Sequence, residues 1–394
     1  FLLNNSLSPL CEKEPPAQYP WLSSSCHCEA VVVGGTITGC AIAASLSKNG
    51  IDTVLLSAQP IGNESACAIP ATFLSGFLRL GILSKKTNME TAIAAFRDFA
   101  LAADQLEKEA SENGIPFARR DILICSDDDK DDRIIEEEYR LRKHNGLKTV
   151  LLDSDILREK YSFSAQRAVF LPNGSTAVDP VRMSQHYAAC AKQNGARIYE
   201  QTEIQDIHQE KGRYRIETST GRYISAKFLI LTQPFLVDLE NDSRIRRRFY
   251  ASASTPCSDF SGYGSKASVF FLNHPFHFCT SEDDRVIAFC TENALFSKSP
   301  RQTHRFELLE SRCHEMLCGT RPVFPDRRAS QLYHATKDGL PTIGPILESG
   351  QAGRLLISLP SSPDELTTAL LSAPLITALC SGKHPYNPYS PDRF

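Results

Sequence analysis

The alternation of apolar and polar positions predicts that the folded part of the chain begins with a βαβ unit. A short apolar run over residues 30–33 predicts a strand, a helical pattern follows over residues 40–48, and residues 51–56 predict a second strand. Gly50 fits the end of this helix. Residues 1–29 carry prolines with serines between them, which predicts an extended N-terminal arm.

Further along the chain, helical and strand patterns alternate, which predicts a mixed α/β fold. Helices are predicted over residues 87–113, 133–144, 182–194, 301–317 and 366–379. Strands are predicted over residues 121–125, 196–203, 214–217, 228–232 and 355–359. Between residues 250 and 292, short apolar runs separated by turn residues predict an antiparallel sheet.

Composition and charge narrow the choice of partner. The 394 residues are 42% hydrophobic, and 43 basic against 46 acidic side chains give a net charge of -3. This balance gives no electrostatic footprint for nucleic acid or an anionic membrane, and the chain has no 18-residue apolar run. We therefore expect a small-molecule ligand, with a protein partner as the other option.

The 13 cysteines are scattered through apolar runs, which suits buried thiols in a reducing compartment and predicts a cytoplasmic location. The chain begins at Phe1, so the sequence leaves N-terminal processing open. Two cysteine-rich spots raise the question of zinc, namely residues 26–28 and Cys313-His314 with Cys318. Neither has a convincing second pair of ligands, so we expect no metal site.

Glycines after the first predicted strand indicate a dinucleotide-binding turn, since bare backbone amides at a helix N-terminus can hold a pyrophosphate. In the G-x-G-x-x-G frame the three positions are Gly34, Thr36 and Gly39, with Gly35 between the first two. Thr36 therefore replaces the glycine that lets phosphate approach closely. Ser57 stands where an acidic residue would bind the ribose. Two interpretations stay open, a dinucleotide site and a well-packed βαβ core.

Several segments resemble the D-amino-acid-oxidase-like family of FAD-dependent oxidoreductases. The resemblance rests on residues 31–39, on the Asp-Gly-Leu-Pro-Thr-Ile-Gly-Pro segment 338–345, on Asp179-Pro180 and on the closing residues 389–394. Within the family the chain looks most like the subgroup of gamma-glutamylputrescine oxidases and Rieske-linked bacterial proteins. The resemblance implies a Rossmann-like FAD-binding domain and a discontinuous substrate domain built on an antiparallel sheet.

The resemblance also implies how the chain divides into domains and which strands lie side by side. We expect an FAD-binding-type domain and a substrate-type domain after the N-terminal arm, with these limits: residues 30–85, 150–235 and 330–394 for the first, residues 86–149 and 236–329 for the second. The βαβ unit is expected to be parallel and to lie against the late strand at residues 355–359. The segment 338–345 is expected beside the glycine turn.

Members of the family bind FAD and oxidise a carbon–nitrogen bond of a small amine or amino acid. The resemblance implies that Gly34, Gly35, Thr36, Gly39, Ser57, Gly339, Ile343 and Gly344 line the cofactor site. It implies that Arg321 binds a substrate carboxylate, although a surface arginine near a turn is the alternative. His274, His277 and Tyr263 could line the pocket, but no general base is assigned.

Several positions depart from the family pattern, and each departure disfavours the binding of FAD. Besides Thr36 and Ser57, Gln233 replaces a glycine after a central strand, and Pro360 and Glu365 replace two glycines of a late strand-to-helix turn. Proline lacks an amide donor, and Glu365 adds negative charge where a helix N-terminus should face the cofactor. The sequence thus leaves open whether FAD binding is lost. The chain is an FAD-dependent oxidoreductase or a flavin-free relative that binds a ligand or a protein.

Overall fold

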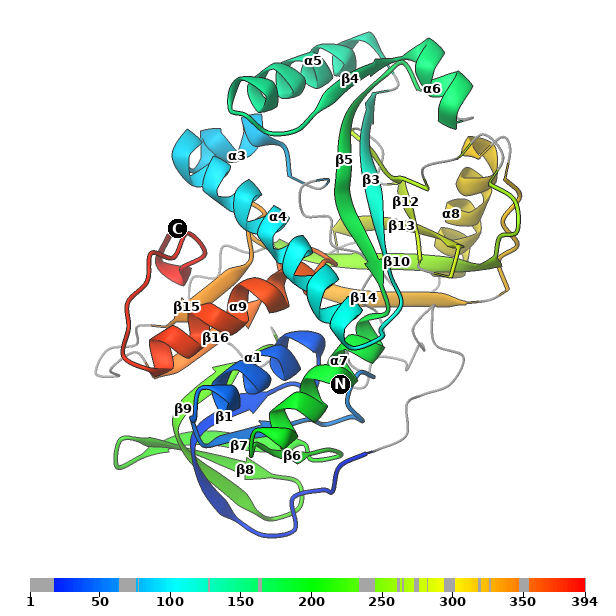
Figure 1. Ribbon diagram of the computed structural model, residues 1–394. Helices are drawn as coiled ribbons and strands as arrows, with labels where there is room; N and C mark the ends of the chain where they lie inside the picture. Colours follow the sequence, from blue (N-terminus) through cyan, green and yellow to red (C-terminus); the bar gives the residue numbers. More distant parts are fainter. Residues whose placement is uncertain are drawn as a thin grey trace.

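A computed structural model describes residues 18–63, 76, 78–126, 128–161, 165–233, 245–260, 263, 266–272, 276–281, 283–293, 302–317, 320–325, 327–346 and 354–393. The described chain forms two eight-stranded sheets with helices packed around them, one sheet below the other in Figure 1. This mixed α/β architecture confirms the predicted fold class.

The first sheet contains the predicted βαβ unit. Its strands run in the order β15 (Thr342–Pro345), β16 (Leu355–Leu359), β9 (Tyr223–Leu231), β1 (Cys26–Val33), β2 (Thr53–Leu56) and β6 (Arg197–Tyr199). The strands β16, β9, β1, β2 and β6 are parallel, and β15 pairs antiparallel with β16. A hairpin of β7 (Ile204–Glu210) and β8 (Arg213–Thr218) extends from β9.

The βαβ unit and the late strand β16 lie in the same sheet, as predicted, but they do not pair directly. Val31 lies opposite Val54, as expected for parallel β1 and β2. β9 lies between β1 and β16, pairing with β1 through Leu229 and with β16 through Leu229 and Leu355. The intervening strand contains the segment predicted at residues 228–232, for which no neighbours in the sheet had been predicted.

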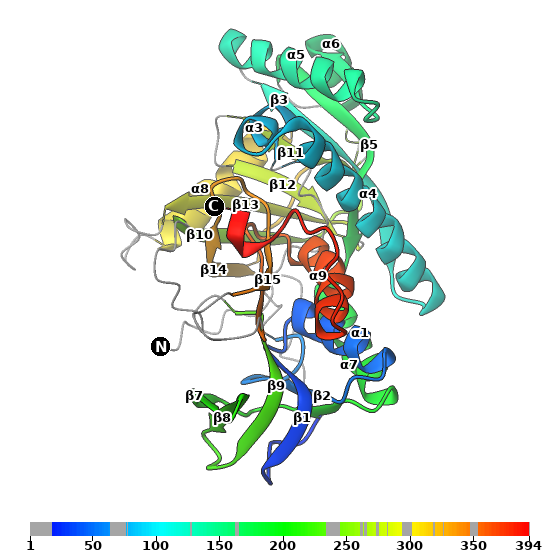
Figure 2. The same cartoon turned by 90° about the vertical axis from the view of Figure 1, so that its left-hand side faces the viewer.

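Three helices cover one face of the first sheet and bury its core. α1 (Ile37–Lys48) packs against α7 (Pro180–Gln193) and α9 (Glu365–Cys380), as both Figure 1 and Figure 2 show. α4 (Met89–Glu112) packs against α9 and carries the helix layer toward the second sheet. The apolar faces of these helices and residues of β1 and β2 form one continuous hydrophobic cluster.

The second sheet runs β14, β10, β13, β12, β11, β3, β5 and β4. Its strands are β14 (Arg328–Ala335), β10 (Ile245–Pro256), β13 (Arg285–Asn293), β12 (Phe276–Thr280), β11 (Ser268–Phe271), β3 (Phe117–Ser126), β5 (Arg167–Val178) and β4 (Val150–Asp153). All neighbouring pairs are antiparallel except β11 with β3. The remaining helices α3 (Leu80–Lys86), α5 (Asp129–His144), α6 (Ser154–Tyr161) and α8 (Gln302–Met316) lie around this sheet.

Some elements differ from the pattern of the sequence. The strand β5 was not predicted, because Asn173, with a positive φ, and Gly174 interrupt its apolar alternation, and its pairing with β3 shifts register at Arg120. β4 and β5 come from the predicted segment 150–235 yet pair within the second sheet. The proposed domain limits remain predictions.

The described part of the predicted N-terminal arm is extended and packed. Residues 18–25 approach the edge strand β6, where Pro20 accepts a hydrogen bond from the Glu200 amide and Leu22 is fully buried. β1 begins at Cys26, four residues before the predicted strand. Among the described residues, no helix has the length and apolar character needed to cross a membrane.

One buried ion pair holds α3 against α5. The Glu138 carboxylate lies 2.6 Å from the Arg142 guanidinium and accepts hydrogen bonds from the amides of Leu80 and Gly81 at the start of α3. The side chains of both charged residues are less than 5% exposed. Because Arg79, the N-cap of α3, provides no side-chain hydrogen bond, Glu138 supplies the cap from another helix.

We expect Glu138→Gln to lower the free energy of unfolding by about 3–5 kcal/mol, because Arg142 would keep a buried charge without its counter-ion. Glu137→Gln is the matched control, since Glu137 is exposed on the same helix and should change stability by less than about 0.5 kcal/mol. Urea denaturation of both variants measures the difference. Equal stabilities would show that the ion pair does not anchor α3.

Candidate functional site

The glycine turn lies at the carboxyl ends of the parallel strands, where open α/β sheets bind their ligands. Gly34 has a φ of +121°, which favours glycine, and Gly39 lies in the first turn of α1. A Cβ atom on Gly39 would lie well inside van der Waals contact with the Gly34 carbonyl oxygen. Both glycines are thus required for α1 to pack closely on β1, and the backbone of a dinucleotide turn is retained.

Thr36 caps the helix that would otherwise face the phosphate. It is the N-cap of α1 and is 5% exposed. Its Oγ accepts a hydrogen bond from the Gly39 amide at 3.4 Å. A side-chain oxygen therefore satisfies one of the amide donors at the N-terminus of α1.

Ser57 lies against Gly35, and its hydroxyl forms hydrogen bonds within its own loop. Its Oγ donates to the Gln59 carbonyl at 2.6 Å and accepts from the Gln59 amide at 3.3 Å. A Cβ on Gly35 would collide with this hydroxyl. The Gly62 amide then donates to the Gly35 carbonyl at 3.2 Å, so the loop after β2 folds back onto the glycine turn.

A buried carboxylate that sequence reasoning missed holds this loop in place. Glu200 is fully buried and follows β6. Its Oε1 accepts from the Ile61 amide at 2.6 Å, and its Oε2 accepts from the amides of Gln18 and Tyr19 at 2.6 and 2.9 Å. Its position after an edge strand carries no motif, so only its three long-range partners identify it.

A small cavity of about 150 Å³ gathers four of the five altered positions. Thr36, Gln233, Pro360 and Glu365 all line it, whereas Ser57 does not. The full lining consists of Thr36, Thr232, Gln233, Phe249, Gln331, Leu332, Tyr333, Pro360, Ser362, Pro363 and Glu365. The departures from the family pattern, which are scattered in the sequence, thus meet at the ends of β1, β9 and β16.

The helix that opens on this cavity is capped from within. Asp364 is the N-cap of α9, and its carboxylate accepts from the Thr367 amide at 2.9 Å and the Thr367 hydroxyl at 2.7 Å. Glu365 follows in the first turn and is 7% exposed. Two carboxylates therefore stand at the positive end of the helix dipole, where an anionic ligand would otherwise be stabilised.

The residues around the small cavity do not fit a pyrophosphate bound in the family's manner. The cavity is smaller than the roughly 300–1,000 Å³ of common ligand pockets. A second negative charge beside the Glu365 carboxylate would be repelled, and Pro360 offers no amide donor. The backbone of the glycine turn fits FAD, but the side chains in front of it disfavour the anionic centre of the molecule.

A second, larger cavity of about 540 Å³ lies between the second sheet, α3 and the turn that precedes α9. Its polar or charged lining residues are Arg79, Lys86, Arg247, His277, Thr291, Tyr333, Thr336, Asp338, Ser361 and Ser362. Phe270 and Phe271 contribute aromatic walls. Tyr333 and Ser362 line both cavities, so the two lie next to each other.

The larger cavity is suited to an anion. Arg79, Lys86 and Arg247 line it, while its acidic member Asp338 is paired with Arg393 at 2.7 Å. The buried Nε of Arg247 donates to no acceptor in the described part of the chain. Burial raises the pKa of the Tyr333 phenol, and the neighbouring Arg247 and a hydrogen bond with Thr291 oppose that rise. The cavity therefore offers positive charge and a neutral hydroxyl.

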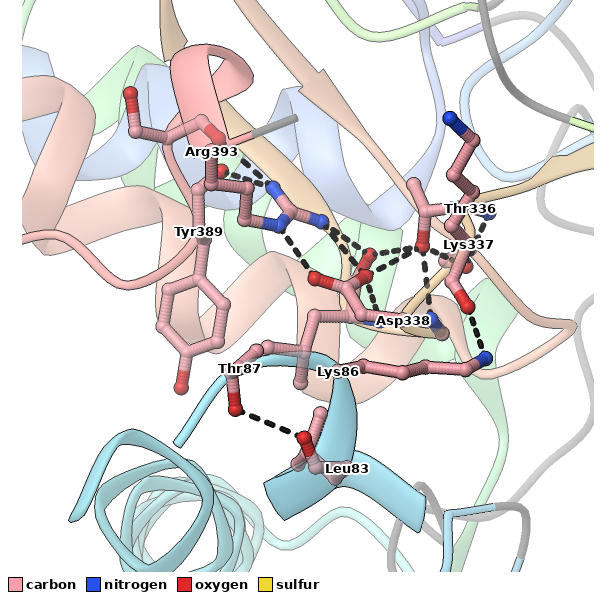
Figure 3. Close-up of polar contacts among 12 residues, drawn as sticks. Leu83, Lys86, Thr87, Thr336, Lys337, Asp338, Tyr389 and Arg393 are labelled. Atoms are coloured by element: carbon pink, nitrogen blue, oxygen red, sulfur yellow. Dashed lines mark hydrogen bonds and ion pairs between the residues drawn. The ribbon is translucent and has the colours of Figure 1, made fainter. Parts of the chain in front are cut away.

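The segment 338–345 is held by the C-terminal residues, as Figure 3 shows. The Arg393 guanidinium faces the Asp338 carboxylate and donates to the Leu340 and Tyr389 carbonyls, while Lys86 donates to the Lys337 carbonyl. The C-terminal residues thus stabilise the loop that borders the larger cavity.

The three predicted cofactor residues of the segment 338–345 lie in two different places. Gly339 lines the larger cavity. Ile343 and Gly344 lie in β15, where the Ile343 amide donates to the Tyr389 carbonyl at 2.8 Å and a Cβ on Gly344 would be 3.0 Å from Pro391. The described contacts of the segment run to Thr336, Leu78, β16 and the C-terminal residues. Contact with the glycine turn stays a prediction.

The structure does not bring Arg321 to either cavity. Arg321 is exposed, and the carbonyls of the next two residues bond to His314 and, at 2.8 Å, to the Thr255 amide. Thr255 is near the end of β10, whereas Arg247 lies near its start. The arginines at the larger cavity are instead Arg79 and Arg247, and Arg247 sits in a run of three arginines without a motif.

Of the other candidates, His277 lines the larger cavity and its Nδ1 accepts from the Phe271 amide at 3.3 Å. Tyr263 is buried in the core and donates to the Ala267 carbonyl. His274 and Cys318 lie outside the described residues. Within the ranges that the structure describes, no three His, Cys, Asp or Glu side chains gather as metal ligands.

Comparison with known proteins finds a family of FAD dependent oxidoreductases and relatives that are oxidoreductases or oxidases. The family described as DAO, FAD dependent oxidoreductase, matches residues 29–379. Gamma-glutamylputrescine oxidoreductase of Escherichia coli is 21% identical over 220 residues, covering 55% of this chain and 51% of the relative. Glycine oxidase of Bacillus subtilis is 27% identical over 199 residues, covering 50% and 51%. The chain spans about half the length of these curated relatives.

Solved structures share the fold over nearly the whole chain. Glycine oxidase from Geobacillus kaustophilus superposes with a TM-score of 0.70 at 16% identity, covering 93% of this chain and 99% of that chain. L-amino acid deaminase from Proteus vulgaris superposes with a TM-score of 0.72 at 15% identity, covering 97% and 100%. At these identities the likeness establishes the fold and leaves activity to the site.

We expect Arg393→Gln to lower the free energy of unfolding by about 3–5 kcal/mol, because Asp338 would stay buried without its counter-ion. Arg182→Gln is the matched control, since its pairing with Asp179 is at 3.6 Å and its side chain is 59% exposed. The control should cost less than about 1 kcal/mol. Thermal unfolding separates the two, and comparable losses would contradict a bracing role for Arg393.

Proposed function

This chain belongs to the DAO family of FAD dependent oxidoreductases, and on that premise we propose that it oxidises a carbon–nitrogen bond of a small amine or amino acid held in the larger cavity. The observation that carries the proposal is the position of Arg247 in the wall of that cavity, between the two sheets. The names of the relatives support the substrate class, since they act on glycine, gamma-glutamylputrescine or L-amino acids.

The charges of the larger cavity support a ligand with a carboxylate. A guanidinium binds a carboxylate through two parallel hydrogen bonds, and the Nε of Arg247 is available for one of them. Lys86 adds a second positive charge at the α3 side. The aromatic walls of Phe270 and Phe271 exclude water from the apolar part of such a ligand, which strengthens its polar contacts.

The reaction of the family requires FAD, and we propose that this chain holds FAD weakly. The support is the small cavity, where a carboxylate, a proline and a helix-capping threonine stand at the altered positions. Losing or opposing one charge-assisted hydrogen bond weakens binding by about ten- to a hundredfold. Several such changes at one surface reduce the affinity further.

A second candidate function is a flavin-free protein that binds a small ligand or a protein partner. It is favoured by one specific observation, namely that four altered positions line the same cavity. Loss of cofactor binding with the fold retained would leave this pattern. In both candidates we propose a cytoplasmic protein, which the ten described free cysteines support.

We expect Arg247→Gln to lower kcat/KM for carboxylate-bearing amines by about ten- to a hundredfold, mainly through KM, because the charge-assisted hydrogen bonds are lost. Arg321→Gln is the matched control and should leave kcat/KM unchanged. The assay follows dye reduction with glycine, L-proline and gamma-glutamylputrescine in the presence of excess FAD. Equal effects of the two variants would contradict a role for Arg247, and no turnover of any substrate would favour the second candidate.

Visible flavin absorbance of the purified protein tests the cofactor directly. We expect little bound FAD in the unmodified protein and a ten- to hundredfold tighter FAD titration after Thr36→Gly with Glu365→Gly, because the cavity gains space and loses a negative charge. A threonine-to-glycine change at an N-cap costs only a few tenths of a kcal/mol, so the fold should persist. Stoichiometric yellow protein from the unmodified chain would refute the weak-binding proposal.

A further inference from the structure

One wall of the larger cavity is a single face of the short helix α3. Its lining residues follow the spacing i, i+3, i+4 and i+7, and they are Arg79, Ile82, Leu83 and Lys86. Arg79 and Lys86 lie at the two ends of this face, about 10 Å apart along the helix axis. The helix thus presents two separate positive groups to the cavity, with an apolar stretch between them.

The Arg79 guanidinium is the positive group of this wall that is open to a ligand. It is half-buried and gives no hydrogen bond to the amides of α3. Among the described residues it pairs with no carboxylate, whereas Lys86 already donates to the Lys337 carbonyl, as Figure 3 shows. A guanidinium carries five N–H donors, so an anion in the cavity would accept hydrogen bonds that the described chain does not use.

The backbone on both sides of Arg79 is held by the buried Glu138–Arg142 ion pair. Arg142 donates to the Leu78 carbonyl at 3.3 Å, and Glu138 accepts from the Leu80 amide at 2.7 Å. Because the Glu138 carboxylate is already paired with Arg142, it fixes the start of α3 without neutralising Arg79. A guanidinium on a fixed backbone loses less conformational entropy on binding than one on a mobile loop, so Arg79 is prepared for a ligand.

The charge of the larger cavity exceeds what one carboxylate can neutralise. Three of its lining side chains are positive, namely Arg79, Lys86 and Arg247. Asp338 is the acidic residue among the described lining residues, and it is paired with Arg393. A ligand with a single carboxylate on Arg247 would leave Arg79 without a counter-ion in a partly buried site. A ligand with a second carboxylate would pair both arginines, which come from two different walls, β10 and α3.

We propose that the substrate of the larger cavity is an aminodicarboxylic acid, with one carboxylate on Arg247 and the second on Arg79. The inference rests on the proposed function for the reaction, and it adds the substrate class and a specificity-determining residue. The cavity of about 540 Å³ has room for such a ligand, since a molecule of glutamate size has about ten heavy atoms and a cavity of about 150 Å³ accommodates benzene.

Isothermal titration of the purified full chain with glutarate and with valerate tests the proposal, because these ions have equal chain length and differ by one carboxylate. At neutral pH we expect glutarate to bind at least about tenfold more tightly, since it makes one more charge-assisted pair. Arg79→Gln should weaken glutarate binding by about ten- to a hundredfold and change valerate binding by less than about twofold. Lys85→Gln, an exposed α3 lysine that does not line the cavity, is the matched control and should bind both ions as the unmodified protein does.

The comparison of the two ions on the unmodified protein keeps the test informative if Arg79→Gln fails to fold. Equal affinities for glutarate and valerate, or a preference for glutarate that survives Arg79→Gln, would overturn the proposal. Dye reduction in excess FAD, with both enantiomers of glutamate and norvaline, separates it from the proposed function. We expect kcat/KM for glutamate to be at least about tenfold higher than for norvaline. A preference for glutarate without turnover of any amine would contradict the proposed function and leave the dicarboxylate site, whereas faster turnover of norvaline would contradict the substrate class alone.

Discussion

The close approach of α1 to β1 is the constraint on which the site depends. Gly39 meets the carbonyl of Gly34 with no space for a Cβ atom, so the helix begins directly at the end of the strand. This contact aims the N-terminus of α1 at the ends of β9 and β16, and it brings Thr36 to the same cavity as Gln233 and Glu365. Any ligand of this edge of the sheet must meet those side chains.

Two helices that open on this edge are neutralised by the protein itself. Thr36 caps α1, and Asp364 and Glu365 stand at the start of α9. A helix N-terminus binds an anion through its free amides and its dipole; the Thr36 hydroxyl accepts from one amide of α1, and two carboxylates oppose anion binding at α9. The side chains of the chain itself thus compete with an anion at both helix N-termini.

The neighbouring cavities differ in charge although they share Tyr333 and Ser362. The larger cavity is positive because Asp338 is neutralised by Arg393, which leaves Arg247, Arg79 and Lys86 to face a ligand. The smaller cavity is lined by one carboxylate, that of Glu365, and otherwise by neutral side chains. The Asp338–Arg393 ion pair thus decides which charges the larger cavity can offer to a ligand.

The sequence by itself determined the family, the mixed α/β class, the parallel βαβ unit and the identity of the altered positions, because periodicity and glycine spacing are local properties. Only the tertiary structure decided that β9 lies between β1 and β16, that Arg247 and not Arg321 reaches the larger cavity, and that Glu200 holds the loop after β2. These features depend on contacts between residues far apart in the chain. Side-chain burial and pairing arise only when the sheets assemble, so no local pattern carries them.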